Sequence, residues 1–156
     1  MIEIKVPGFR NLQLSHLVLD YNGTIAADGE LLPGVGEALK EISADLQIHV
    51  LTADTFNFAA EQVAGLPLKL VIIPLDSQAE AKLAYVSELG VDNAVAIGNG
   101  RNDRAMLKAA AVGIALVQKE GGSAETFASA DIISVSILDA LELLVNPKRL
   151  IATLRS

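Results

Sequence analysis

The stretch "LVLDYNGTIAADG" (17–29) decides the fold, because it joins a buried strand to a turn through a single acid. It begins with an uninterrupted apolar run, ends that run on Asp20 and turns at once through "YNGT" (21–24). An uninterrupted apolar strand is typical of a sheet that is covered on both faces. Asp20 then has two interpretations: an acid that ends a strand at the solvent, or a carboxylate held at the rim of a sheet for chemistry.

Short apolar runs and amphipathic stretches alternate along the rest of the chain. Strands are expected over residues 16–20, 47–54, 68–74, 93–100, 112–117 and 131–136. Helices are expected over residues 33–44, 55–65, 76–90, 102–111 and 122–130, with one or two more over 136–155. This alternation predicts an α/β fold, a Rossmann-like three-layer sandwich with a mainly parallel sheet and right-handed crossovers. We expect one domain over residues 1–156, in which "MIEIKV" and "NLQL" form a small hairpin or an edge strand.

The composition narrows the class of protein. Of 156 residues, 51% are hydrophobic and 20% are charged, which is typical of a globular chain. The formal charge of -7 and the low aromatic content argue against nucleic acid as a partner. No apolar run reaches the length of a membrane span and the N-terminus lacks a signal-peptide pattern, so we expect no membrane partner and a cytoplasmic location. Cysteine is absent, and we interpret His16 and His49 as ordinary strand residues, which disfavours a His/Cys zinc site.

Polar residues stand at the carboxyl ends of four expected strands. They are Asp20 with Asn22, Thr52 with Asp54, residues 74–76, and Asn99 with Asp103. Parallel sheets bind ligands beyond the carboxyl ends of their strands, near a topological switch point. We therefore expect these side chains to converge on one site.

At these positions the chain resembles the haloacid dehalogenase superfamily of phosphotransferases. The motifs "DYNGT" (20–24) and "LTAD" (51–54), the lysine Lys82, and "GNGRND" (98–103) follow one another in the order and spacing of that superfamily. They look most like the catalytic domain of P-type ATPases and its soluble relatives, with their DKTGT-type, TGD-type, lysine and GDGxND-type motifs. The resemblance covers roughly residues 15–145.

The resemblance implies a role for each motif residue. Asp20 would be the nucleophile that forms an aspartyl phosphate, Thr52 would hold a phosphoryl oxygen, and Lys82 would neutralise the shared charge. Mg²⁺, which prefers oxygen ligands, is the implied cofactor. The implied metal ligands are Asp20, Asn22 through its backbone carbonyl, Asn99 and Asp103, and Asp54 is left open. The implied substrate contacts are Asn22, Gly23, Ala53 and Asn102.

Two residues depart from the superfamily pattern. Asn22 replaces the aspartate that serves as general acid and base in the DxD phosphatases, and an amide cannot do that work at neutral pH. We therefore expect slow turnover, a long-lived phospho-Asp20 and a preference for good leaving groups. Asn99 replaces the first aspartate of the fourth motif and removes one negative charge, so Mg²⁺ should bind more weakly before phosphate arrives.

Each residue also has an ordinary alternative. Asp20 could be a strand-end acid, Thr52 a strand residue with a satisfied hydroxyl, and Lys82 a solvated helix lysine. Asp54 and the "NGRND" segment could cap the helices that follow them. For the whole chain the alternatives are a Mg²⁺-dependent phosphohydrolase or phosphotransferase, a phosphate- or metal-binding regulatory protein of the same fold, and a receiver-like module. The last is disfavoured because it has no role for the glycine motifs.

The spacing of the motifs leaves no room for a cap domain over the site. Both the interval between Thr24 and Thr52 and that between Asp54 and Lys82 are filled by the expected helices and strands. An open site accepts a phosphorylated small molecule or a phosphoprotein, and a neighbouring subunit could act as the lid. A homo-oligomer is therefore possible, with "IIPLDS" (72–77) and "MIEIKV" (1–6) as candidate contact segments.

Overall fold

A six-stranded sheet, parallel at every pairing, forms the centre of the computed structural model, which describes residues 1–54 and 57–156. The strands are β3 (His16–Asp20), β6 (Gln47–Thr52), β7 (Lys69–Ile72), β8 (Ala94–Gly98), β9 (Val112–Leu116) and β10 (Ile132–Ser134). Their order in the sheet is β10-β9-β8-β3-β6-β7. The chain builds outward from β3 in one direction, then returns and builds in the other, so the topological switch point lies at β3.

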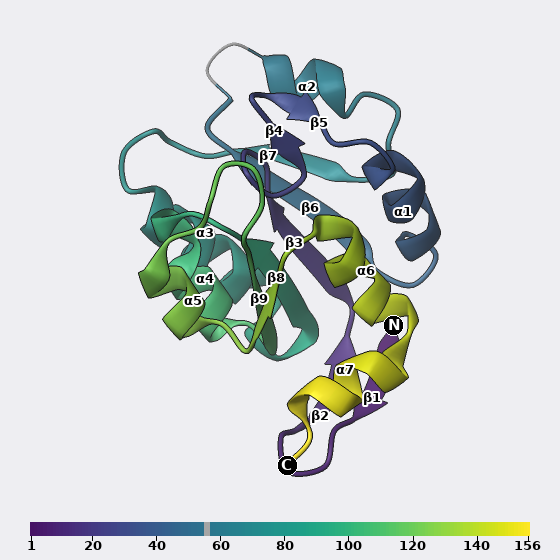
Figure 1. Cartoon of the computed structure of the whole chain (residues 1–156). Helices are drawn as coiled ribbons and strands as arrows, with labels where there is room; N and C mark the ends of the chain where they lie inside the picture. Colours follow the sequence, from purple (N-terminus) through teal and green to yellow (C-terminus); the bar gives the residue numbers. More distant parts are fainter. Residues whose placement is uncertain (55–56) are drawn as a thin grey trace.

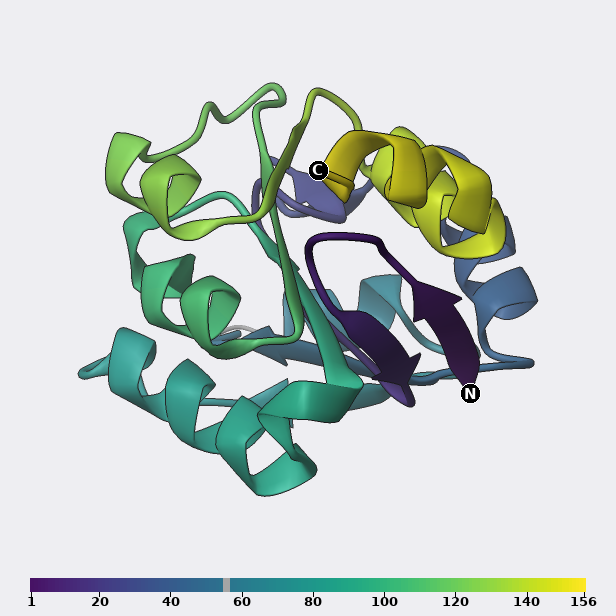
Figure 2. The ribbon, with the colours of Figure 1, turned by 90° about the horizontal axis from the view of Figure 1, so that it is seen from below.

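Helices cover both faces of this sheet. They are α1 (Val35–Ile42), α2 (Phe58–Gln62), α3 (Gln78–Leu89), α4 (Arg104–Ala109), α5 (Ala124–Ser129), α6 (Ile137–Val145) and α7 (Pro147–Leu154), with single 3₁₀ turns at Val91–Asn93 and Arg101–Asp103. Figure 2 shows α3, α4 and α5 on one side of the sheet and α1, α6 and α7 on the other. The predicted three-layer α/β fold is confirmed.

The apolar strands bury both of their faces, as their composition predicts. In β3, Leu17 and Leu19 belong to the larger core cluster, which also holds the expected stripe of α1 (Val35, Leu39 and Ile42). Val18 points the opposite way, into a second cluster with Val86 of α3 and Leu107 of α4. This alternation with period two fixes the register of β3 and hence the direction in which Asp20 projects.

Two short hairpins flank the sheet. The first pairs β1 (Ile2–Lys5) with β2 (Asn11–Leu14), as one of the expected alternatives has it, and lies against α7 at the end of the molecule remote from the carboxyl ends of the strands (Figure 1). The second pairs β4 (Ala26–Ala27) with β5 (Glu30–Leu31) and was not predicted. Its turn is Asp28–Gly29, with φ of 51° and 83°, which is the left-handed geometry that "DG" favours in a tight hairpin.

Several predicted boundaries were too generous. The strand expected over 47–54 ends at Thr52, and the helix expected over 102–111 is a 3₁₀ turn followed by α4 at Arg104–Ala109. The helix expected over 55–65 is α2 at Phe58–Gln62; positions 55–56 of that prediction lie outside the described residues. In the part of the chain that the structure describes, no helix combines the length and the apolar character needed to cross a bilayer.

The two histidines form part of a partly buried polar chain, in which His49 is the buried member. His16 Nδ1 lies 3.2 Å from His49 Nε2, and His49 Nδ1 lies 2.8 Å from the Tyr85 hydroxyl. Burial, followed by the charges of His16 and Lys69, lowers the pKa of His49 to about 4. His49 therefore stays neutral in the folded protein at physiological pH.

Candidate active site

The sheet brings three of the predicted residues to one rim. In the register of the sheet, Asp20 at the end of β3 lies beside Leu51, so Thr52 follows on one side, and Leu19 lies beside Ile97, so Asn99 follows on the other. A cavity of about 450 Å³ opens there. Its lining includes these predicted residues: Asp20, Asn22, Thr52, Ala53, Asp54, Lys82, Asn99 and Asn102.

Lys82 is the centre of the site, although nothing in its local sequence distinguishes it from a surface lysine. It projects from α3 and is only 1% exposed. Its Nζ donates to Asp20 Oδ1 at 2.8 Å, to Asp103 Oδ1 at 2.7 Å and to Asn102 Oδ1 at 3.0 Å. The predicted pairing of Lys82 with the nucleophile position is therefore present, and the solvated-lysine alternative is wrong.

The electrostatics of this triad follow from its burial. Burial alone would lower the pKa of Lys82, but the Asp20 and Asp103 carboxylates together raise it above its ordinary value. Burial, and then the nearby Asp20 carboxylate, raise the pKa of Asp103 to about 7, against the opposing pull of Lys82. One buried ammonium thus holds two carboxylates together.

Asp103 is not among the residues that line the cavity, and its predicted role as a direct metal ligand stays a prediction. It is fully buried, and while Oδ1 accepts from Lys82, Oδ2 accepts from the backbone amides of Asn99 at 3.1 Å and Gly100 at 3.0 Å. Gly98 makes room for it, because a Cβ there would lie 2.4 Å from Asp103 Cγ. Asp103 therefore fixes Lys82 and the fourth-motif loop. Its side chain does not cap α4 either.

Asn99 and the first-motif turn are tied together. The Thr24 hydroxyl donates to Asp20 Oδ2 at 3.2 Å and lies 3.4 Å from Asn99 Oδ1, while Asn99 Nδ2 donates to the Gly121 carbonyl at 3.1 Å. The Gly121 contact fixes the amide so that its oxygen faces the Thr24 hydroxyl. Gly23 has φ of 79° and a Cβ there would lie 2.2 Å from Asn99 Nδ2, so only glycine fits.

Asp54 takes the ordinary role that the sequence left open. Its Oδ1 accepts from the Ala59 amide at 2.9 Å and its Oδ2 from the Ala60 amide at 3.2 Å, so both oxygens cap the first turn of α2. Thr52, 6% exposed, accepts from the Asp54 amide at 3.3 Å. Its hydroxyl proton is free to donate, because that bond uses only a lone pair of the oxygen.

Sequence reasoning missed several residues of the cavity. Gln78 lines it and accepts from Asn102 Nδ2 at 2.9 Å, which orients the Asn102 oxygen toward Lys82. Tyr21, Gly29, Phe58 and Leu75 form its outer wall. Only the "DG" turn signal pointed to any of them. The others lie in segments that are remote in sequence, and no local pattern marks them.

The oxygen ligands at the cavity suit a hard divalent cation, but they carry little negative charge. Asp20, Asn22 and Asn99 offer oxygens at the cavity, which is the ligand type that Mg²⁺ prefers. Across residues 1–54 and 57–156, no three His, Cys, Asp or Glu side chains gather closely enough to hold a metal ion by themselves. The charge that a cation would meet is therefore mainly that of Asp20, already shared with Lys82.

Comparisons with known proteins agree with this geometry. No family model matches the chain. It is 45% identical over 83 residues to the uncharacterized protein MJ0073 of Methanocaldococcus jannaschii, a match that covers 51% of this chain and 89% of the relative. A 3-deoxy-D-manno-octulosonate 8-phosphate phosphatase of Moraxella catarrhalis, in complex with magnesium, phosphate and KDO, superposes with a TM-score of 0.71 at 17% identity over 90% of this chain and 92% of its own.

Two further solved structures are similar to this chain, and the second of them is the catalytic domain of a CPx-ATPase. The putative hydrolase of the haloacid dehalogenase superfamily from Legionella pneumophila has a TM-score of 0.72 at 14% identity, covering 90% of this chain and 86% of its own. The catalytic domain of the CPx-ATPase CopB-B has a TM-score of 0.61 at a higher identity of 27%, covering 73% of this chain and 45% of its own. The fold is therefore that of haloacid dehalogenase superfamily phosphatases and of a CPx-ATPase catalytic domain, and the resemblance predicted from the ordered motifs is confirmed at this level.

Proposed function

We propose that this protein is a Mg²⁺-dependent phosphohydrolase or phosphotransferase that works through an aspartyl phosphate on Asp20. The observation that carries the proposal is the position of Asp20, at the base of an open cavity, with one oxygen on the buried Lys82 ammonium at 2.8 Å and the other beside the Thr24 hydroxyl. A carboxylate held in this way is oriented for attack and has its negative charge balanced.

The reaction follows from the groups around Asp20. A carboxylate oxygen of Asp20 attacks the phosphorus atom, the new O–P bond forms, and the bond from phosphorus to the leaving oxygen breaks. Lys82 neutralises charge on the shared oxygens, while the Thr52 hydroxyl and the Asn102 side chain bind the transferred group. Asn22 and Ala53 line the cavity, whereas Gly23, predicted as a substrate contact, is not among the lining residues and forms the turn behind them. Water then hydrolyses the acyl phosphate and regenerates Asp20.

Asp20, the backbone carbonyl of Asn22 and the side-chain oxygen of Asn99 would hold Mg²⁺. The bound cation would supply Lewis-acid stabilisation of the charge that develops on the phosphoryl oxygens. Asp103 contributes by positioning Lys82. The neutral Asn99 in place of an aspartate means that the phosphoryl group itself must supply much of the charge that attracts the cation.

The leaving group must depart without a strong acid beside it. Asn22 has no proton to give at neutral pH, and losing a general acid or base costs about 10²–10⁴ in rate. We infer slow turnover, and a preference for leaving groups that are stable as anions, such as acyl or aryl oxides.

The alternative is a phosphate- or metal-binding regulatory protein of the same fold. A binder has no need for a nucleophile, yet the chain keeps Asp20 and a fully buried Lys82 against it. The pairing alone would serve a structural role as well, but Asp20 also lines the open cavity, where a ligand can reach its carboxylate. The catalytic proposal is therefore the better supported of the two.

One experiment tests the proposal directly. Wild type and Asp20→Asn are incubated with Mg²⁺ and either acetyl phosphate or an aryl phosphate, and the acid-stable mass increase of one phosphoryl group is measured on the intact chain, with and without hydroxylamine. We expect a hydroxylamine-sensitive phosphoryl adduct on wild type alone. Equal, negligible signals from both proteins would leave the binding alternative in place.

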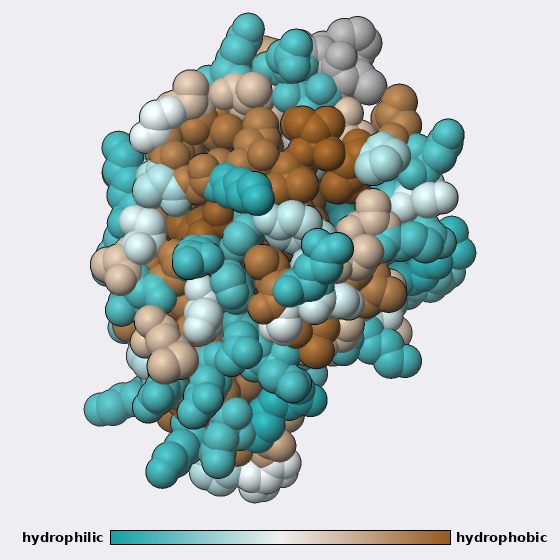
Figure 3. Space-filling view, turned by 180° about the vertical axis from the view of Figure 1, so that it is seen from behind, coloured by the Kyte–Doolittle hydropathy of each residue, from teal (hydrophilic) through white to brown (hydrophobic). Residues whose placement is uncertain are grey.

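The expected partners other than substrate stay predictions, as does the cytoplasmic location. Figure 3 shows apolar side chains gathered on the upper part of one face, where the edge strand β7 lies. Ile72 is 57% exposed and Leu75 is 62% exposed, both within the "IIPLDS" segment predicted as a contact. Light scattering coupled to size-exclusion chromatography measures the oligomeric state.

A further inference from the structure

Part of the lining of the catalytic cavity is apolar or aromatic. Besides polar residues such as Asp54 and Gln78, the lining includes Tyr21, Gly29, Phe58, Ala59 and Leu75. Phe58 is 40% exposed and Leu75 is 62% exposed, so two large apolar side chains stand at the mouth with much of their surface in water. Such a wall gains about 25 cal/mol for each Å² of apolar surface that a ligand removes from water.

Contact with the β4–β5 hairpin fixes the position of the Phe58 side chain. The Tyr21 hydroxyl donates to the Gly29 carbonyl at 2.6 Å and anchors the turn of the β4–β5 hairpin. Gly29 has φ of 83°, and a Cβ there would lie 2.9 Å from Phe58 Cε1. The absence of a side chain at Gly29 therefore lets the Phe58 ring lie directly against the hairpin backbone.

The charged residues that line the cavity do not suit a leaving group that carries an additional carboxylate. Among the described lining residues, Lys82 is the one cation, and its ammonium is already shared between Asp20 and Asp103. The other charged lining residues are Asp20 and Asp54, both acids. A carboxylate on the leaving group would thus be desolvated beside negative charge, without a partner.

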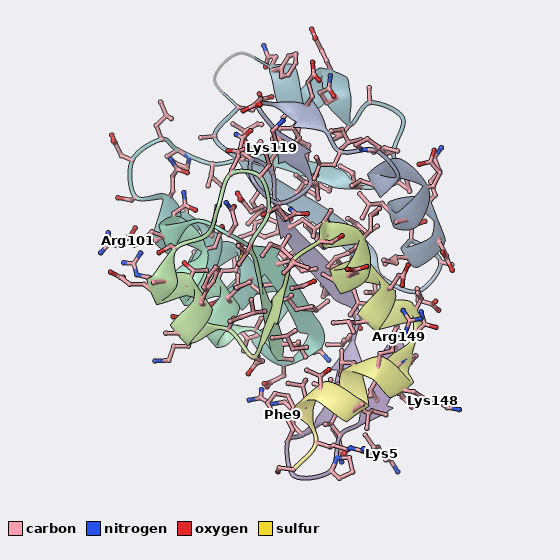
Figure 4. The ribbon with its side chains drawn as sticks, in the orientation of Figure 1. Lys5, Phe9, Arg101, Lys119, Lys148 and Arg149 are labelled. Atoms are coloured by element: carbon pink, nitrogen blue, oxygen red, sulfur yellow. The ribbon has the colours of Figure 1, made fainter. Side chains whose placement is uncertain are left out.

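Arg101 and Arg104 line a neighbouring pocket that shares Leu75, Gln78 and Asn102 with the cavity, and both are paired with an acid there. Arg101 and Arg104 lie 3.3 Å and 3.6 Å from the carboxylate of Glu125, and Lys119 lies 3.9 Å from that of Asp28. Figure 4 shows Arg101 at the outer edge of the molecule, near α5. None of the three lines the cavity.

We propose that the natural substrate carries its phosphoryl group on an uncharged aryl or similarly apolar group, rather than on a carboxylated sugar. This inference rests on the proposed function and names the substrate class of the same site. It separates this chain from its structural neighbour of Moraxella catarrhalis, whose complex holds the sugar acid KDO. The lining side chains of Phe58 and Leu75 favour an apolar leaving group, and so does the lack of a second cation among the described residues that line the cavity.

The test compares phenyl phosphate with 4-carboxyphenyl phosphate, whose leaving groups are similar in acidity but differ by one carboxylate. We expect kcat/KM to be about tenfold or more higher for the phenyl ester, the scale of discrimination that an apolar pocket provides. Phe58→Ala and Leu75→Ala should reduce that ratio toward one. Ile72→Ala, which removes a side chain of similar exposure outside the cavity, should leave the ratio unchanged.

The outcomes separate this inference from the proposed function. If both esters are hydrolysed equally, or if the carboxylated ester is preferred and Arg101→Ala abolishes the preference, the inference is overturned while the phosphatase stands. If no ester is hydrolysed and no adduct forms on Asp20, the proposed function is overturned. The inference is then decided by calorimetric titration of Asp20→Asn with phenylphosphonate and 4-carboxyphenylphosphonate: tighter binding of the former supports it, and equal or reversed affinities refute it.

Discussion

Replacing Lys82 with methionine removes the ammonium that joins two buried carboxylates while keeping most of the side-chain volume. Lys82 is 1% exposed and Asp103 is fully buried, so neither partner can recover its hydration in the variant. Breaking a buried ion pair by removing one partner costs about 3–5 kcal/mol. We expect Lys82→Met to lose about that much free energy of unfolding at pH 7.5, measured by urea denaturation followed by circular dichroism.

The pH dependence of this loss has a definite sign. Burial and Asp20 already raise the pKa of Asp103 to about 7, and Lys82 is the group that opposes the rise. Without Lys82 the folded protein binds this proton far more readily than the unfolded chain, whose aspartate pKa is about 3.9. Stability of the variant relative to wild type should therefore improve as the pH falls from 8 to 5.

A double-mutant cycle completes the argument. Asp103→Asn removes the second charge, so Lys82→Met should cost at least about 1 kcal/mol less in the Asp103→Asn background, within the range found for residues in one network. A loss below about 1 kcal/mol for Lys82→Met, or strict additivity of the two substitutions, would refute the idea that this triad is a strongly coupled buried unit.

Three further predictions test separate parts of the structure. Gly23→Ala forces a Cβ to within 2.2 Å of Asn99 Nδ2 at φ of 79°, so we expect more than about 1 kcal/mol of destabilisation and a fall in phosphoryl-adduct formation, against a Gly65→Ala control that has the same strained φ but open space. Asn99→Asp sets a carboxylate oxygen against the Gly121 carbonyl, now 3.1 Å from Asn99 Nδ2, so thermal unfolding without metal should show a loss of about 1–3 kcal/mol, and an unchanged stability would contradict that contact. Between pH 6.5 and about 4 the unfolded chain protonates His49 and the folded protein does not, so stability should fall by up to about 3 kcal/mol as the pH is lowered through this window, and His49→Gln should flatten that slope in urea titrations.

Local sequence patterns accounted for the fold because the determinants of this sheet are local. Three consecutive apolar residues before Asp20 identify a strand with two buried faces, and the spacing of Val35, Leu39 and Ile42 identifies the helix that covers one of them. Alternation of such units leaves few topologies open, because crossovers are right-handed. The "DG" turn at Asp28 carried the signal for the β4–β5 hairpin, but strands of two residues are too short for any periodicity to show.

Some features of the candidate site follow from local sequence, and others depend on how distant segments pack together. The sequence by itself indicated that Asp20, Thr52 and Asn99 lie near the carboxyl ends of strands, because an apolar run leads into each, although the strands expected to reach 54 and 100 end at Thr52 and Gly98. Only the tertiary structure decided that Lys82 is buried between two acids and that Asp103 contacts it away from the cavity lining. Those roles depend on distances between segments far apart in the chain, and such distances are set by how helices pack on the sheet, which no short stretch of residues encodes.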